Sequence, residues 1–211
     1  MPNFNFNYLN NKVNYNEEEP EEKEAISLES LSLNRSFDKE FLKQRKVFLW
    51  GVVDDKSAKE VINRLLYLDA QNKEEISFYI NSPGGMVTSG MVIYDTMQLI
   101  ESPISTICMG LAASMGSILL SAGKKGRRFV FPHGEIMIHQ PSLGGVYQGT
   151  SADIEIQAEQ IIKTKKIGAQ ILAENCNKTI DKVLKDFDRD YWMDANEAVK
   201  YGIVDSIIKK I

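Results

Sequence analysis

A candidate nucleophile, Ser114, lies in the segment from Gly110 to Gly116 (GLAASMG), between an apolar run and a stretch with helical character. A serine at the start of a helix holds its hydroxyl beside unpaired backbone N–H groups, which stabilise negative charge. Serine at such a position is more often a plain N-cap, and the motif by itself favours that interpretation. The segment also lacks the Gly-x-Ser-x-Gly motif of the α/β-hydrolases, so it does not predict that fold.

The sequence SPGG at residues 82–85 follows an apolar run at residues 76–80. Glycines at the end of a strand let the backbone turn with positive φ and approach a bulky neighbour, and the N–H of Gly85 can then point into a cleft. By itself this is a common turn between a strand and a helix. In open α/β sheets, however, ligands bind beyond the carboxyl ends of the strands, where we expect both this turn and Ser114.

A serine nucleophile needs a base, and the chain has two histidines that can supply an imidazole. His133 stands between Pro132 and Gly134 and is typical of a turn. His139 ends a predicted strand at residues 136–139 and is the better candidate for the base. A lone histidine at a strand end is more often structural, so this assignment needs support from elsewhere.

The base in turn needs an acceptor that orients its ring. Asp186, Asp188 and Asp190 follow the last long helix at alternate positions. Asp190 is plausible because it precedes Tyr191 and Trp192, which we expect to shield it from water. Spacing alone does not choose Asp190 over the other two aspartates.

Strands and helices must position these side chains, and apolar runs that alternate with stretches of helical periodicity predict where they lie. Repeated strand–helix–strand units predict an α/β domain with parallel strands wrapped by helices. A small-residue turn is expected before Ser114, and a glycine-rich loop at residues 141–149. Strands are expected at residues 46–53, 76–80, 104–109, 128–131, 136–139 and 203–208, and helices at residues 57–70, 88–100, 114–122, 152–174, 182–187 and 196–201.

Composition and charge indicate a globular domain with an acidic N-terminal segment. The chain has 211 residues, 43% of them hydrophobic and 26% charged, which is typical of a globular domain. Residues 1–30 carry two lysines and seven glutamates, a net charge of −5, and residues 31–211 carry a net +1. We expect the acidic segment 1–30 to be disordered, as a propeptide or an axial segment, and residues 31–211 to form the folded domain. The balanced charge of that domain does not predict binding to nucleic acid.

Two cysteines, Cys108 and Cys176, are too few for a disulfide framework or a four-ligand zinc site. We see neither an apolar run long enough to span a bilayer nor the pattern of a signal peptide. We therefore expect a cytoplasmic protein that needs neither a metal nor a membrane.

Several long motifs resemble the ClpP family of self-compartmentalised serine peptidases, over about residues 34–211. The resemblance implies that Ser114 is the nucleophile, His139 the general base and acid, and Asp190 the carboxylate that orients His139. It makes the backbone N–H groups of Gly85 and Met115 the oxyanion hole. The motifs are INSPGG (80–85), IYDTMQ (93–98), STICMGLAASMGS (105–117), MIHQP (137–141), YQG (147–149), ADIEIQA (152–158) and EAVKYGIVDSI (197–207).

The resemblance also implies a fold and an assembly. The fold would be crotonase-like, with repeated β–α units and a protruding strand–helix handle. Copies of the chain would form two stacked heptameric rings around a chamber, with Asp188 and Arg189 as an acid–arginine pair between the rings. Polypeptide substrates would bind as an added strand beside Leu143, Gly144 and Gly145.

Members of this family work with AAA+ Clp unfoldases, which use the ATP, so the resemblance implies no cofactor for this chain. The unfoldase would dock in apolar pockets between subunits. Core packing is the alternative role for the residues at the matching positions. These residues are Tyr79, Ile107, Met109, Phe131 and Ile208.

Two other functions fit parts of the sequence. A non-catalytic ring subunit would assemble with an active paralogue, but such subunits commonly lose a member of the triad, and Ser114, His139 and Asp190 are all present. A crotonase-type acyl-CoA enzyme would need a basic patch for the nucleotide, which we do not find. The resemblance therefore favours a serine endopeptidase that cleaves unfolded polypeptides to short peptides.

Overall fold

The computed structural model describes residues 28–142 and 148–210. The chain divides into two units, residues 1–37 and 38–211. Helix α1 (Leu28–Lys43) spans this division and was not predicted from the sequence. Residues 28–30 of the acidic segment begin α1, and the rest of that segment lies outside the described residues.

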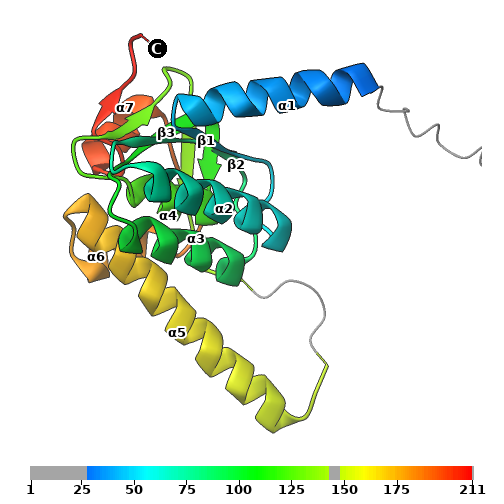
Figure 1. The fold of residues 1–211 in the computed structure, drawn as a ribbon. Coiled ribbons are helices and arrows are strands. Elements are labelled where there is room, and N and C mark those ends of the chain that lie inside the picture. Colours follow the sequence, from blue (N-terminus) through cyan, green and yellow to red (C-terminus); the bar gives the residue numbers. More distant parts are fainter. Residues whose placement is uncertain (1–27, 143–147, 211) are drawn as a thin grey trace, which may run out of the picture. The chain divides into compact units, whose positions relative to one another are not determined.

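The second unit alternates strands and helices, as the sequence predicted (Figure 1). Its strands are β1 (Lys46–Trp50), β2 (Ile76–Ser82), β3 (Ile104–Ala113), β4 (Arg128–Val130), β5 (Glu135–Ile138), β6 (Tyr191–Met193) and β7 (Ser206–Ile207). The helices that follow α1 are α2 (Asp55–Gln71), α3 (Val87–Leu99), α4 (Met115–Ser121), α5 (Ser151–Cys176), α6 (Ile180–Asp186) and α7 (Ala195–Tyr201).

Parallel pairing dominates the sheet, which runs in the order β1-β2-β3-β4-β7. Strand β5 pairs in parallel with the last residues of β3, and β6 pairs antiparallel with β5. The predicted α/β class with parallel strands is confirmed. Strand β6 was not predicted, and the expected closing strand at residues 203–208 shrinks to β7 because only two of its residues pair with β4.

The hydrophobic core lies on one face of the sheet. Side chains such as Leu49, Phe78, Ile80 and Val130 are fully buried there, because alternate residues of a strand point to the same face. Helices α2, α3 and α4 gather on one side of the strands in Figure 1. Their apolar residues, including Val61, belong to the same core.

Strand β3 continues to Ala113, so the small-residue turn expected at residues 110–113 is wrong. Between its pairs with Ile80 and Ser82 of β2, β3 holds extra residues that bulge out of the ladder. The Asn81 Oδ1 accepts a hydrogen bond from the Leu111 N–H at 3.2 Å, which supports the bulged backbone. The last residues of β3 then pair with β5, and Ser114 directly follows the end of β3.

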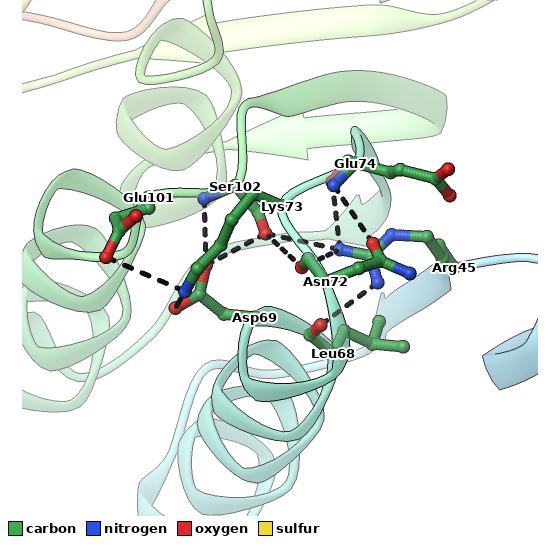
Figure 2. A network of polar contacts seen from close by, with 8 residues as sticks. All are labelled: Arg45, Leu68, Asp69, Asn72, Lys73, Glu74, Glu101 and Ser102. Atoms are coloured by element: carbon green, nitrogen blue, oxygen red, sulfur yellow. Dashed lines mark hydrogen bonds and ion pairs between the residues drawn. The ribbon is translucent and has the colours of Figure 1, made fainter.

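Arg45 directly precedes β1, at the end of the sheet away from Ser114. Its side chain caps the C-terminus of helix α2 (Figure 2). Its guanidinium donates to the carbonyl oxygens of Leu68 at 3.0 Å and Asn72 at 3.3 Å, at the C-terminal end of α2, and to that of Glu74 at 2.8 Å. The last turn of α2 has no basic residue of its own. Arg45 therefore supplies the positive charge that a helix C-terminus favours.

Helix α5 has an exposed N-terminal half and a C-terminal half that packs into the core from Ala169 onward. Arg128 ties this packed end to β4: its Nη1 donates to the Asn175 carbonyl at 2.8 Å, and its Nε donates to the Asp205 carboxylate at 3.0 Å. Figure 1 shows the other end of α5 extending away from the strands. No helix within the described residues has the length and apolar character to cross a membrane.

Candidate active site

Ser114 stands at the junction of β3 and α4, in the N-cap position. Its hydroxyl makes no capping hydrogen bond. Instead the Ser114 Oγ lies 2.9 Å from the Nε2 of His139. The N-cap interpretation that the motif favoured therefore describes the backbone position of Ser114 and not the use of its hydroxyl.

The backbone of Ser114 has φ 53° and ψ −122°, a conformation that L-residues rarely adopt. Such strain persists only where the surroundings hold it, and it is common at functional sites. Hydrogen bonds on both sides hold Ser114 here: its N–H donates to the Met137 carbonyl at 2.9 Å, and its carbonyl accepts from Ser117. The sharp turn from β3 to α4 places the Ser114 hydroxyl next to His139. The turn forms although the sequence lacks the Gly-x-Ser-x-Gly motif.

Gly84 packs directly behind Ser114. A Cβ built on Gly84 would lie 2.6 Å from the Ser114 Cβ and 2.7 Å from the Ala113 carbonyl oxygen, and its φ of +89° also excludes most side chains. The turn at residues 82–85 thus approaches a bulky neighbour as the sequence predicted, and that neighbour is the Ser114 turn itself.

His139 follows the last residue of β5, and Asp190 precedes the first residue of β6. The Nδ1 of His139 lies 3.0 Å from the Asp190 Oδ1, so the imidazole contacts Ser114 on one side and Asp190 on the other. The neutral tautomer with a proton on Nδ1 satisfies both contacts, because Nδ1–H then donates to the carboxylate and Nε2 accepts from the hydroxyl.

The expected shielding of Asp190 by its aromatic neighbours is wrong. The Asp190 side chain is 60% exposed, and Tyr191 and Trp192 are exposed as well. The Tyr191 ring packs near that of Tyr201, with ring centroids 5.7 Å apart. The carboxylate is therefore held by hydrogen bonding and backbone placement and not by burial.

The two residues predicted to supply the oxyanion hole are each next to the Ser114 turn in sequence or through a neighbour: Met115 follows Ser114, and Gly85 follows Gly84, which packs against Ser114. Met115 is the first residue of α4. The Val53 N–H donates to the Gly84 carbonyl, and the Val53 carbonyl accepts from the Met86 N–H, both at 2.8 Å. These two bonds form the parallel bridge between Val53 and Gly85. A side chain on Gly85 would collide with the Val53 carbonyl.

A cavity of about 370 Å³ opens beside Ser114 and His139. Its wall is largely apolar and comes from α3, α4, β5 and α5. Such a cavity suits an apolar side chain of a bound peptide next to the hydroxyl. Residues that line it include Val92, Ile118, Ile138, Ile167, Leu172 and Phe187.

Neither cysteine competes with Ser114 as a nucleophile. Both thiols are buried, and burial raises the pKa of Cys108 to about 12 and that of Cys176 to about 11. A thiol is nucleophilic as the thiolate, which these values suppress near neutral pH. In the part of the chain that the structure describes, no group of three or more His, Cys, Asp or Glu residues is arranged to hold a metal ion.

Comparison with known proteins identifies the family. The Clp protease family matches residues 32–211. The chain belongs to the Clp protease family. It is 47% identical over 169 residues to the ATP-dependent Clp protease proteolytic subunit of Carsonella ruddii (strain PV), an alignment that covers 80% of this chain and 86% of that protein. The resemblance read from the sequence motifs is thereby confirmed, and the protein is a peptidase.

Three of the residues predicted to dock an unfoldase on this Clp protease lie on the neighbouring strands β2 and β3, and the other two directly follow β4 and β7. Tyr79 and Ile107 share one face of the sheet. The register aligns Tyr79 with Ile107, and this face is opposite to the one that carries Phe78 and Cys108. Ile107 is buried in the isolated chain, and the other four residues are half-buried. The full set is Tyr79, Ile107, Met109, Phe131 and Ile208.

The other predicted contacts of this Clp protease fall on two segments. Asp188 and Arg189 lie between α6 and β6, next to Asp190, and both are exposed. The predicted substrate-pairing residues Leu143, Gly144 and Gly145 lie outside the described residues.

Sequence reasoning missed Gln140 near this site. Its side-chain Nε2 donates to the Asp188 carbonyl at 2.7 Å. The available signal was its place directly after His139, which puts it at the same end of β5.

Proposed function

We propose that this Clp protease is a serine endopeptidase and the proteolytic subunit of an ATP-dependent Clp protease, with Ser114, His139 and Asp190 as its catalytic triad. The observation that carries the proposal is the hydrogen-bonded chain through His139, 2.9 Å to the Ser114 Oγ and 3.0 Å to the Asp190 Oδ1. A nucleophile bonded to a base that a third group orients is the arrangement that acyl transfer needs.

The reaction begins when the Ser114 Oγ attacks the carbonyl carbon of the scissile peptide bond and His139 Nε2 takes the hydroxyl proton. Asp190 holds the imidazole with Nδ1–H toward its carboxylate and stabilises the imidazolium that forms. His139 then gives the proton to the leaving amine, and the acyl group stays on Ser114. Water, activated by His139 in the same way, hydrolyses the acyl-enzyme and restores the hydroxyl.

The N–H groups of Gly85 and Met115 would hold the oxyanion of the tetrahedral intermediate. The contact of Gly84 with Ser114 and the position of Met115 directly after Ser114 support this role, and donors of this kind contribute roughly 3–4 kcal/mol each to transition-state stabilisation where tested. The apolar cavity beside Ser114 would take the side chain on the acyl side of the scissile bond.

The proposal extends to the assembly in which the subunit works. Copies of the chain form two stacked heptameric rings, with Asp188 and Arg189 at the contact between rings, and an unfolded polypeptide adds a strand beside Leu143, Gly144 and Gly145. A AAA+ Clp unfoldase docks at the apolar pocket that contains Tyr79 and consumes the ATP, so this chain needs no cofactor. The complex is cytoplasmic.

Fluorophosphonate labelling tests the nucleophile. The assembled protein should be labelled at Ser114 and should hydrolyse short fluorogenic peptides, and Ser114→Ala should abolish both. Ser151→Ala, at an exposed serine that begins α5, is the control and should change neither. Continued labelling of Ser114→Ala would refute the assignment of the nucleophile. Peptide hydrolysis that needs an added paralogue would make this chain a non-catalytic ring subunit.

A further inference from the structure

Gln140 joins the end of β5 to the segment that carries Asp190. Its backbone N–H donates to the Phe187 carbonyl at 2.6 Å. Its side-chain Nε2 donates to the Asp188 carbonyl at 2.7 Å and to the Asp188 Oδ1 at 3.2 Å. Gln140 follows His139, and Asp188 stands two positions before Asp190. The Gln140–Asp188 contact therefore links the same two segments as the His139–Asp190 contact.

The Asp190 segment needs such a restraint because regular pairing ends before it. The β5–β6 ladder stops at the pair Ile138 and Tyr191. Phe187 is buried and anchors the far end of the segment, whereas Asp188, Arg189 and Asp190 are exposed in the isolated chain. Three exposed residues between a buried anchor and a strand leave the carboxylate free to move unless side chains hold the backbone.

Two side chains hold Asp188 from different elements. Gln140 comes from the end of β5, and the Nζ of Lys165 on α5 lies 3.4 Å from the Asp188 Oδ1. The contact with Lys165 is a long ion pair with an exposed partner, which contributes little. Gln140 binds the Asp188 backbone carbonyl as well, at a shorter distance, and therefore restrains the course of the chain itself.

We infer that Gln140 is a positioning residue for peptide hydrolysis, which holds the 188–190 backbone so that the Asp190 carboxylate stays in line with Nδ1 of His139. The inference rests on the proposed function, because it acts through the triad. Gln140 does not line the cavity beside Ser114, and the inference gives it no part in the chemistry itself. Its loss lets Asp190 leave the imidazole, which lowers the fraction of enzyme with an aligned base.

Gln140→Met tests the inference, because methionine keeps the size of the side chain and the backbone N–H but removes the amide donor. We expect kcat for a fluorogenic peptide to fall about tenfold, less than the ~100-fold that a full 1 Å misplacement costs. KM should stay within about twofold, because Gln140 does not line the cavity beside Ser114. Rates are expressed per serine that fluorophosphonate labels when the labelling has run to completion, so unfolded protein does not contribute and slow labelling does not hide the effect. Gln140→Ala should behave in the same way.

Gln98→Met is the matched control. Gln98 on α3 is exposed and also donates from its Nε2 to a backbone carbonyl, that of Ala122 at 3.3 Å, away from the triad. Its replacement should leave kcat and KM unchanged. A normal kcat in both Gln140 variants, or an equal fall in Gln98→Met, would overturn the role of Gln140.

A double variant separates this inference from the proposed function. In the Asp190→Asn background, Gln140→Met should not slow fluorophosphonate labelling of Ser114 further, because the group that Gln140 positions has lost its charge. A second, additive loss would show that Gln140 acts elsewhere and would overturn the inference alone. If Asp190→Asn itself retained full activity, the proposed triad would fail first.

Discussion

His139 faces Asp190 because the two residues stand one position beyond the last pair of an antiparallel ladder, Ile138 of β5 and Tyr191 of β6. This register decides among the three aspartates that spacing left open. Asp186 binds the Tyr201 hydroxyl at 3.0 Å and Lys182, and Asp188 binds Gln140 and Lys165. Asp190 alone of the three contacts the imidazole among the hydrogen bonds of the described residues.

Asp190→Asn should lower kcat for peptide hydrolysis by about 10³-fold. An amide cannot stabilise the imidazolium and favours the wrong tautomer, which costs about 10⁴-fold in a buried triad. The loss here should be smaller because the Asp190 side chain is 60% exposed and water replaces part of its effect. Steady-state hydrolysis of a fluorogenic peptide measures it. A loss below about tenfold would mean that Asp190 does not orient His139.

Gly84→Ala should abolish most of the activity, because the new methyl group would press on Ser114 at 2.6 Å and displace its hydroxyl. A shift of this kind costs ~100-fold or more in kcat/KM.

Gly126→Ala is the matched control for this substitution. Gly126 has a similar positive φ of +83° but no atom within 4 Å of an added Cβ. Both variants carry the backbone strain, roughly 1–2 kcal/mol, and only Gly84→Ala carries the crowding. Equal activity in the two variants would show that contact with Ser114 does not matter.

Arg45→Met should lower the free energy of unfolding by about 3 kcal/mol, because it removes hydrogen bonds from a charged donor to several backbone carbonyls (Figure 2). Thermal or denaturant unfolding measures the change. The specific activity of the folded fraction should remain normal, since Arg45 lies at the end of the sheet away from Ser114. Arg127→Met is the control: Arg127 is 57% exposed, pairs with Glu75 and should cost under about 1 kcal/mol.

Acid should destabilise the protein between about pH 4 and pH 2 partly through Asp69. A hydrogen bond from Lys73, with further bonds from the Ser102 N–H and hydroxyl, holds the pKa of Asp69 at about 2. In the unfolded chain this pKa is about 3.9, so the stabilisation is complete above pH 4 and is lost as the pH falls through the folded-state value.

The pH dependence of unfolding, followed by denaturant titration at each pH, tests the role of Asp69. Asp69→Asn should flatten the decline between pH 4 and pH 2. Lys73→Met should make the decline smaller and end it at a higher pH, because it removes the largest cause of the lowered pKa and so brings the folded-state pKa of Asp69 closer to the unfolded-state value. An unchanged profile in both variants would contradict the role of this carboxylate.

Local patterns in the sequence predicted the fold class well, because they report on neighbours along one element. Apolar alternation marks β2, whose residues alternate between buried and half-buried, and a helical period marks α2, with Val61, Leu65 and Leu68 buried. The same patterns failed where pairing with distant segments decides the structure. Strand β6 has only Met193 buried, and the end of β3 is composed of small residues that are typical of a turn.

For the site, the sequence by itself determined the chemical types of the residues. It pointed to one serine before a helix, one histidine at a strand end, and a turn with two glycines, and its motifs identified the family. Only the tertiary structure brought His139 within 3.0 Å of Asp190, 51 positions away, and Gly84 against Ser114. The physical reason is that the first contact depends on the register of β5 and β6, and the second on the close approach of two turns. The hydrophobic periodicity of a single helix or strand carries no information on either.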